Sequence, residues 1–159
     1  MYDFRIDAGD TAAMYADLGA ALEALMAGET DAIANMANAV AVIWETLPDL
    51  NWCGIYRNVD GELVLGPFQG RPACIRIPFG QGVCGAAAAT LETQRVDDVH
   101  AFDGHIACDA ASESEIVVPL VKDGKLLGVL DLDSPKKARF SEADQTGCEK
   151  IAALIAAAI

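Results

Sequence analysis

Apolar residues recur at intervals of three and four in two segments near the start of the chain, a spacing that predicts amphipathic helices. The first predicted helix spans Thr11–Met26. The second runs from Asp31 to about Thr46, with Thr30 as its N-cap, and Leu47-Pro48 ends it. We expect both helices to cover a sheet, although such a pair would also suit a homodimer interface.

After Asp49 the period changes to two, which is typical of strands. The run NWCGIYR at residues 51–57 places Trp52 and Tyr56 on the same face of the first strand. Asp60-Gly61 predicts a hairpin turn, and the returning strand is expected at 62–66, followed by an irregular stretch.

The later pattern predicts a short strand, a helix, a second short strand, a hairpin and a final helix. Their expected bounds are 73–77, 83–93, 94–96, 115–122 with 125–133, and 141 to the C-terminus. Ser141, with Asp144 three residues on, resembles a capping box. Because hairpins dominate, the order predicts an α+β fold with a mainly antiparallel sheet, formed by residues 1–159 as a single domain.

The net charge of this 159-residue chain is −13 at pH 7. A surface that negative repels phosphate backbones and anionic membranes, so neither nucleic acid nor a membrane is an expected partner. It tolerates a ligand with an ammonium group. The N-terminus has no apolar leader, and the C-terminal IAALIAAAI is too short to span a bilayer, so we expect a cytoplasmic protein.

Five cysteines are present, with no CxxC pair, which argues against a disulfide scaffold. Cys84 opens a predicted helix, and a helix N-terminus stabilises a thiolate. Cys108 follows His105, which favours a thiolate when charged, but precedes Asp109, which opposes one. The local sequence therefore does not choose the reactive thiol. A zinc site made of cysteines and histidines lacks the usual close pairs, so no metal is expected.

The segment 97–115 is too polar for a core element, and it contains Cys108 and both histidines, His100 and His105. Long irregular segments in compact domains are usually functional or disordered. Apolar residues within this one argue against a disordered tail. We expect an ordered active-site loop, with a plain solvated connector as the alternative.

Three carboxylates are expected to meet near the end of the second hairpin. Asp131 and Asp133 share one face of a strand, and Glu115 begins the neighbouring strand. Such a group can bind an ammonium, or can keep one carboxyl protonated as a general acid; the alternative is a solvated strand end. Trp52 and Tyr56 could wall a ligand pocket or belong to the core.

Six runs, taken together, resemble those of a known family. They are LMAGET, NWCGIY, LVLGPFQG, ACIRIPFGQGVCG, DVHAFDGHIACDAASESEIVVPL and GVLDLDS. In this order, over roughly residues 15–140, the chain resembles the free methionine-(R)-sulfoxide reductases, which are GAF-domain enzymes. The resemblance implies a GAF fold, with a roughly six-stranded antiparallel sheet, helices on one side and a pocket on the other.

The same resemblance implies reduction of free L-methionine-(R)-sulfoxide to methionine through a cysteine sulfenic acid and an intramolecular disulfide. It implies no cofactor, with thioredoxin as the external reductant. Cys108, in GHIACDA, is implied as the nucleophile, Cys74 as the resolving thiol, and Cys84 as a third thiol for disulfide exchange. Cys53 and Cys148 lie outside this set and are expected to be structural. The implied substrate-binding residues are Trp52, Tyr56, Glu115, Asp131 and Asp133.

A noncatalytic GAF module that binds a small molecule is the alternative, because the fold is widely used for sensing. Tight binding of a cyclic nucleotide without sulfoxide reduction would favour that alternative.

Overall fold

The computed structural model describes residues 9–106 and 110–159. Its elements are α1 (Thr11–Met26), α2 (Ala32–Thr46), β1 (Trp52–Val59), β2 (Glu62–Gly70), β3 (Arg76–Pro78), α3 (Gly82–Thr90), β4 (Gln94–Val96), the short 3-10 helix η1 (Val99–Ala101), β5 (Ser114–Lys122), β6 (Lys125–Ser134) and α4 (Glu142–Ala158). None of the described helices is long and apolar enough to cross a membrane.

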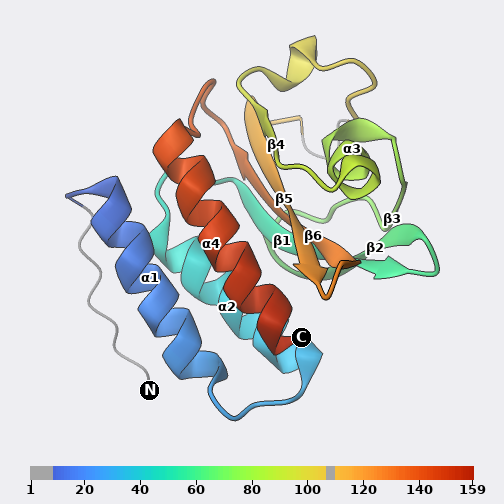
Figure 1. Ribbon diagram of the computed structural model, residues 1–159. Helices are drawn as coiled ribbons and strands as arrows, with labels where there is room; N and C mark the ends of the chain where they lie inside the picture. Colours follow the sequence, from blue (N-terminus) through green and yellow to red (C-terminus); the bar gives the residue numbers. More distant parts are fainter. Residues whose placement is uncertain (1–8, 107–109) are drawn as a thin grey trace.

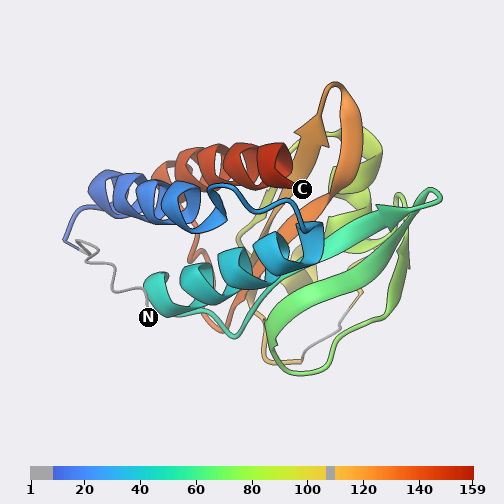
Figure 2. The same cartoon turned by 90° about the horizontal axis from the view of Figure 1, so that it is seen from below.

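The six strands form one antiparallel sheet in the order β3-β2-β1-β6-β5-β4 (Figure 1). Helices α1, α2 and α4 lie on one face, and α3 lies on the other (Figures 1 and 2). The predicted α+β fold with an antiparallel sheet is therefore confirmed. Of the two central strands, β1 carries Trp52 and Tyr56, and β6 carries Asp131 and Asp133.

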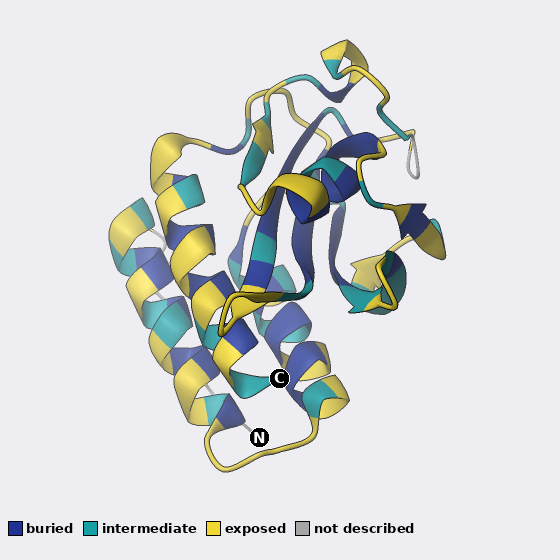
Figure 3. Cartoon of the chain, turned by 45° about the vertical axis from the view of Figure 1, so that its right-hand side comes forward, coloured by how far each residue is buried: buried dark blue, intermediate teal, exposed yellow. Residues whose placement is uncertain are grey.

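Two apolar cores lie on opposite faces of the sheet. Cys53 and Ile55 of β1 point into the core under α1, α2 and α4, which also holds Cys148. Trp52 and Tyr56 point into the second core, beneath α3. The predicted period of two is thus confirmed, and both structural thiols are buried as expected. In Figure 3 the helix faces that pack inward are buried and the outward faces are exposed.

Two tight turns close the β1–β2 and β5–β6 hairpins. Asp60 and Gly61 both have positive φ, at 53° and 85°, and Asp123 and Gly124 have φ of 53° and 74°. Two consecutive left-handed residues are characteristic of a type I′ turn, whose twist matches that of the flanking strands. Both predicted hairpins are confirmed.

Strand β2 is longer than predicted, because it continues to Gly70 and pairs with β1 on both sides of Gly66 and Pro67. The expectation of an irregular stretch after Gly66 is wrong. Strand β3 pairs only with residues 62–64, so the rest of β2 is a sheet edge where Pro67 costs no ladder hydrogen bond. A register shift between Gly54 and Tyr56 absorbs the irregularity.

Three smaller expectations are also corrected. Cys74 precedes β3 instead of lying on it, because the carbonyl oxygen of Cys74 accepts from a side chain, Tyr56 Oη, at 3.0 Å. Helix α3 stops at Thr90, where Leu91 takes a left-handed C-cap conformation. Asp31, and not Thr30, caps α2 through its side chain.

The capping box of Ser141 and Asp144 is confirmed, and it joins a buried contact between α4 and α1. Tyr15 Oη of α1 donates to Asp144 Oδ1 at 2.9 Å, and Arg139 pairs with Asp144 at 3.1 Å. The ring of Tyr15 packs directly over Gly147, where there is no room for a Cβ atom.

We therefore expect Gly147→Ala to lower the free energy of unfolding by about 1–3 kcal/mol through overpacking. Gly19→Ala in α1 is the matched control, because its Cβ would meet Leu154 Cδ1 at an ordinary 3.5 Å. There, the better helix propensity of alanine should stabilise by about 0.5–1 kcal/mol. Urea unfolding followed by circular dichroism measures both, and equal effects of the two changes would contradict the steric argument.

Candidate active site

A cavity of about 520 Å³, its open mouth included, lies on the α3 face of the sheet. That size suits a small-molecule ligand. Its lining comes from β1, β3, β5, β6, the start of α3 and two loops. The lining residues are Trp52, Tyr56, Pro72, Ala73, Ile77, Gln81, Gly82, Val83, Cys84, His105, Ile106, Ser112, Glu115, Asp131 and Asp133.

The three predicted carboxylates converge because strand register aligns them. Asp133 of β6 pairs with Glu115 of β5 on one side and with Trp52 of β1 on the other. Asp131 lies two residues earlier on β6, on the same face. Glu115 is 6% exposed and Asp131 is 5% exposed, so the alternative of a solvated strand end is wrong for these two side chains.

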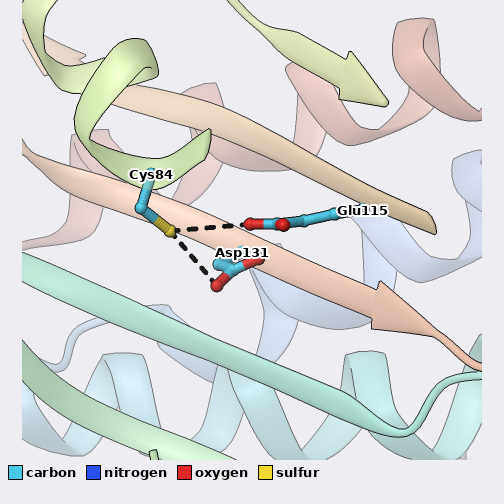
Figure 4. Close-up of side chains that lie close together, drawn as sticks. All are labelled: Cys84, Glu115 and Asp131. Carbon is cyan, nitrogen blue, oxygen red and sulfur yellow. Dashed lines mark hydrogen bonds between the residues drawn. The ribbon is translucent and has the colours of Figure 1, made fainter. Parts of the chain in front are cut away.

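The first turn of α3 places the thiol of Cys84 against two of these carboxylates (Figure 4). Its Sγ lies 3.2 Å from Asp131 Oδ2 and 3.9 Å from Glu115 Oε1. Burial, followed by the charges of Asp131 and Glu115, raises the pKa of Cys84 well above its ordinary value. Burial and the neighbouring carboxylates therefore oppose the thiolate form of Cys84, which the helix start alone would favour.

Glu115 and Asp131 lie close together in the buried site, with carboxylate oxygens within 4.8 Å of each other. Burial, reinforced by Asp131 and Asp133, raises the pKa of Glu115 well above its ordinary value. Burial also raises the pKa of Asp131, to about 7, while hydrogen bonds from Cys84 and Glu115 hold it down. Both carboxyls therefore favour the protonated form more than an exposed carboxyl does, which is the property that a general acid at neutral pH requires.

One carboxylate oxygen of Asp131 can accept a hydrogen bond from a bound ligand. Asp131 Oδ1 is buried and has no hydrogen-bond partner among the described residues. Buried oxygens without a partner are rare and costly in folded proteins. In a residue that lines the cavity, such an oxygen is suited to accept from a bound ligand.

The aromatic wall predicted from β1 is present and is also packed. The ring of Trp52 stacks on Tyr56 at 5.8 Å and on Phe68 at 5.4 Å between centroids. Gly54 permits this arrangement, because the indole occupies the space that a Cβ would need. Both interpretations from the sequence, pocket wall and core, therefore apply to Trp52 and Tyr56.

The polar ends of these aromatic side chains hold the segment that carries Cys74. Trp52 Nε1 donates to the carbonyl of Arg71 at 3.1 Å, and Tyr56 Oη donates to that of Cys74 at 3.0 Å. Cys74 is disulfide-bonded, whereas Cys84 is a free buried thiol. Cys108, the predicted nucleophile, lies outside the described residues.

The two ends of the polar loop are held to each other and to the segment that follows β6. Val99 donates its backbone N–H to the carbonyl of Glu113 at 2.9 Å, and Lys137 pairs with Asp98 at 2.7 Å. His100 Nε2 lies 3.6 Å from Glu113 Oε2, at the surface. These contacts support an ordered loop over its described parts, 97–106 and 110–115.

Sequence reasoning gave His105 no role, yet it lines the cavity. Burial, and secondarily the charge of His100, lowers the pKa of His105, so the imidazole is neutral near pH 7. Gln81, Gly82 and Ser112 were also missed. The GQG turn before Cys84 was the available signal, since Gly82 has φ of 62° and packs against Ile106.

Metal binding can be judged from the donor atoms. Those of Cys84, Glu115 and Asp131 lie within 4.8 Å of one another, as do those of Asp98, His100 and Glu113. Neither group matches the cysteine–histidine set considered from the sequence. A metal bound by Cys84, Glu115 and Asp131 would have to displace the protons of a thiol and a carboxylic acid.

Known proteins resemble the chain over most of its length. A family model described as GAF domain matches residues 22–159. The free methionine-R-sulfoxide reductase of Escherichia coli (strain K12) is 55% identical over 87% of this chain and 84% of its own. The enzyme of that name from Saccharomyces cerevisiae is 46% identical over 84% and 78%, respectively.

A solved structure gives the same result in three dimensions. The free methionine-R-sulfoxide reductase of Neisseria meningitidis, determined in complex with its substrate, superimposes with a TM-score of 0.95 at 45% identity. The match covers 99% of this chain and 95% of that one.

Proposed function

Because the chain belongs to the free methionine-R-sulfoxide reductases of the GAF family, we propose that its cavity reduces free L-methionine-(R)-sulfoxide with Cys108 as nucleophile. Membership in this enzyme family sets the noncatalytic sensor aside. The observation that carries the proposed mechanism is the buried pair of Glu115 and Asp131, where burial raises the pKa of both carboxyl groups.

Substrate binding uses the carboxylates and the aromatic wall. The ammonium of the free amino acid binds Asp131 Oδ1, the buried oxygen without a partner in the described structure, and Asp133 supplies a second negative charge. A peptide-bound residue has an amide at this position and cannot form that ion pair. The S-methyl group packs against Trp52.

The reduction step needs a nucleophile and an acid. The Cys108 thiolate attacks the sulfoxide sulfur while Glu115 delivers its proton to the sulfoxide oxygen. The S–O bond and the transient S–S bond then break as the protonated oxygen passes to Cys108 Sγ, so methionine leaves and Cys108 becomes a sulfenic acid. The raised pKa of Glu115 supports this assignment, because an acid must still hold its proton at neutral pH.

Cys74 resolves the sulfenic acid. Its thiol condenses with Cys108, water leaves, and a disulfide forms, which a protein dithiol of the thioredoxin class then reduces. The disulfide-bonded state of Cys74 and the free state of Cys84 support this choice. Because a disulfide holds its two Cα atoms within about 7 Å, any longer resting separation requires loop movement during turnover. A homodimer through α1 and α2 stays a prediction, testable by analytical ultracentrifugation.

We expect thioredoxin-coupled NADPH oxidation with the free (R)-sulfoxide, and little with its N-acetyl derivative. Removing the ammonium should lower kcat/KM by about 10²-fold or more, since it leaves a buried carboxylate unpaired. The (S)-epimer is the control for stereochemistry. Equal turnover of free and N-acetylated substrate would refute the ammonium site, and no turnover of any sulfoxide would refute the function.

A further inference from the structure

An exposed apolar side chain lies directly beside the disulfide-bonded cysteine. Ile75 is 69% exposed, more than any other large apolar side chain of the described residues. Cys74, the residue before it, is disulfide-bonded and partly buried. Single exposed apolar residues are common on proteins, so exposure alone would mean little.

Three hydrogen bonds show that the exposure of Ile75 is built into the fold. The carbonyl of Ile75 accepts from the backbone N–H of Leu65 at 2.9 Å. The carbonyls of Arg71 and Cys74 accept from Trp52 and Tyr56, as described above. Residues 71–75 are therefore held by their backbone, so the outward position of Ile75 does not arise from fraying.

The surroundings of Ile75 offer further binding features. It leads into β3, which is at the edge of the sheet and pairs only with β2. An edge strand presents backbone groups to an extended segment of another chain. Arg71 and Arg76 flank the cysteine and the isoleucine, and both are exposed, although Arg76 pairs with Glu62 at 2.9 Å.

We propose that Ile75 and the adjoining edge of β3 form the docking surface for the protein dithiol that reduces the Cys74 disulfide. The proposal rests on the function given above and adds where its reductant binds. A thiolate must approach the disulfide along the S–S axis, so a protein donor has to contact the residues beside the attacked sulfur. An apolar side chain there contributes contact area, and the arginines favour an acidic partner.

The exchange balances in two steps. The first thiolate of the reductant bonds to Cys74 Sγ, and the other enzyme sulfur leaves as a thiolate that takes up a proton. The second reductant thiol then displaces Cys74 from this mixed disulfide. The enzyme gains two electrons and two protons, and the reductant becomes a disulfide.

The test compares two reductants on the same variant. In Ile75→Ser we expect kcat/KM for thioredoxin to fall about tenfold, through a higher KM, because part of the burial of one isoleucine is lost. Turnover supported by dithiothreitol, and the KM for the sulfoxide, should match wild type, because a small dithiol needs no docking surface. Leu91→Ser is the matched control, since Leu91 is 48% exposed and lies at the C-cap of α3.

Unchanged thioredoxin kinetics in Ile75→Ser would overturn the docking surface. So would an equal loss with both reductants, which would show that Ile75 acts on the disulfide or the fold, or an equal loss in Leu91→Ser. Failure of the wild-type protein with dithiothreitol as well as thioredoxin would instead refute the reductase function itself.

Discussion

Cys108→Ser should abolish sulfoxide reduction, with a loss of about 10³-fold or more, because a serine hydroxyl is a poor nucleophile at neutral pH and cannot form a sulfenic acid. Methionine released in a single turnover, measured by chromatography without any reductant, isolates this step from recycling. Trapping the Cys74→Ser variant with dimedone after one turnover should label Cys108. Methionine formation at the wild-type rate by Cys108→Ser would overturn the assignment.

The variant Cys74→Ser separates the attack of Cys108 on the sulfoxide from the later formation of the disulfide. This variant should release one equivalent of methionine at close to the wild-type rate and then stop when thioredoxin is the only reductant. Cys84→Ser is the matched control, since its side chain can still donate to Asp131, and we expect repeated turnover within about tenfold of wild type. If Cys84→Ser also stops after one equivalent, Cys84 takes part in the exchange, and mapping of the disulfides by mass spectrometry would identify its partner.

Glu115→Gln should lower kcat by about 10²–10³-fold with a smaller effect on KM, because an amide cannot protonate the departing oxygen. Asp131→Asn should instead act mainly on KM, since it removes the negative charge proposed to hold the ammonium. Steady-state kinetics with the free (R)-sulfoxide measure both. If Asp131→Asn instead lowered kcat and Glu115→Gln mainly raised KM, the roles of the two residues would be exchanged.

The same carboxyl pair predicts the pH dependence of activity. Asp131 has a pKa of about 7, so kcat/KM should fall as the pH drops through 7 and the site loses its charge. Glu115 must keep its proton, so kcat should fall on the alkaline side, at the raised pKa of that group. The profile should be bell-shaped in wild type, and Asp131→Asn should lose the acid limb.

Stability should respond to this pair in the opposite sense to activity. The pKa of Asp131 rises from an ordinary 3.8 to about 7 on folding, so the folded protein binds more protons than the unfolded chain between these values. The stabilising contribution of the protonated carboxyl is complete below pH 3.8 and is lost as pH rises through 7. Asp131→Asn should therefore be more stable than wild type above pH 7, and the difference should vanish in acid.

Strand periodicity predicted the part of the site that depends on the sheet. Alternation placed Trp52 and Tyr56 together, and the hairpin around Asp123-Gly124 brought Glu115 opposite Asp133. These relations follow from the period of two and from the turn type, both of which are local properties. The antiparallel sheet and the final helix with its capping box were predictable for the same reason.

What the sequence could not supply was the environment of individual groups. Cys84 begins a helix, which favours a thiolate, but only the folded chain reveals that two buried carboxylates lie within 4 Å of its sulfur. Cys74 was expected on a strand, but its backbone carbonyl accepts a hydrogen bond from the side chain of Tyr56 on β1. His105 lacks any neighbouring motif, and its place in the cavity depends on how the loop crosses α3. Each of these properties arises from contacts between residues distant in the chain.

The hairpin geometry also determines where the protein tolerates added sequence. Glu115 and Asp133 pair near one end of β5 and β6, whereas Asp123 and Gly124 close the other end, where Lys122 pairs with Lys125. A reporter peptide or fluorescent domain inserted between Asp123 and Gly124 would leave every cross-strand pair of the cavity in place. This turn is therefore a site where an inserted domain can be attached without disturbing the pocket.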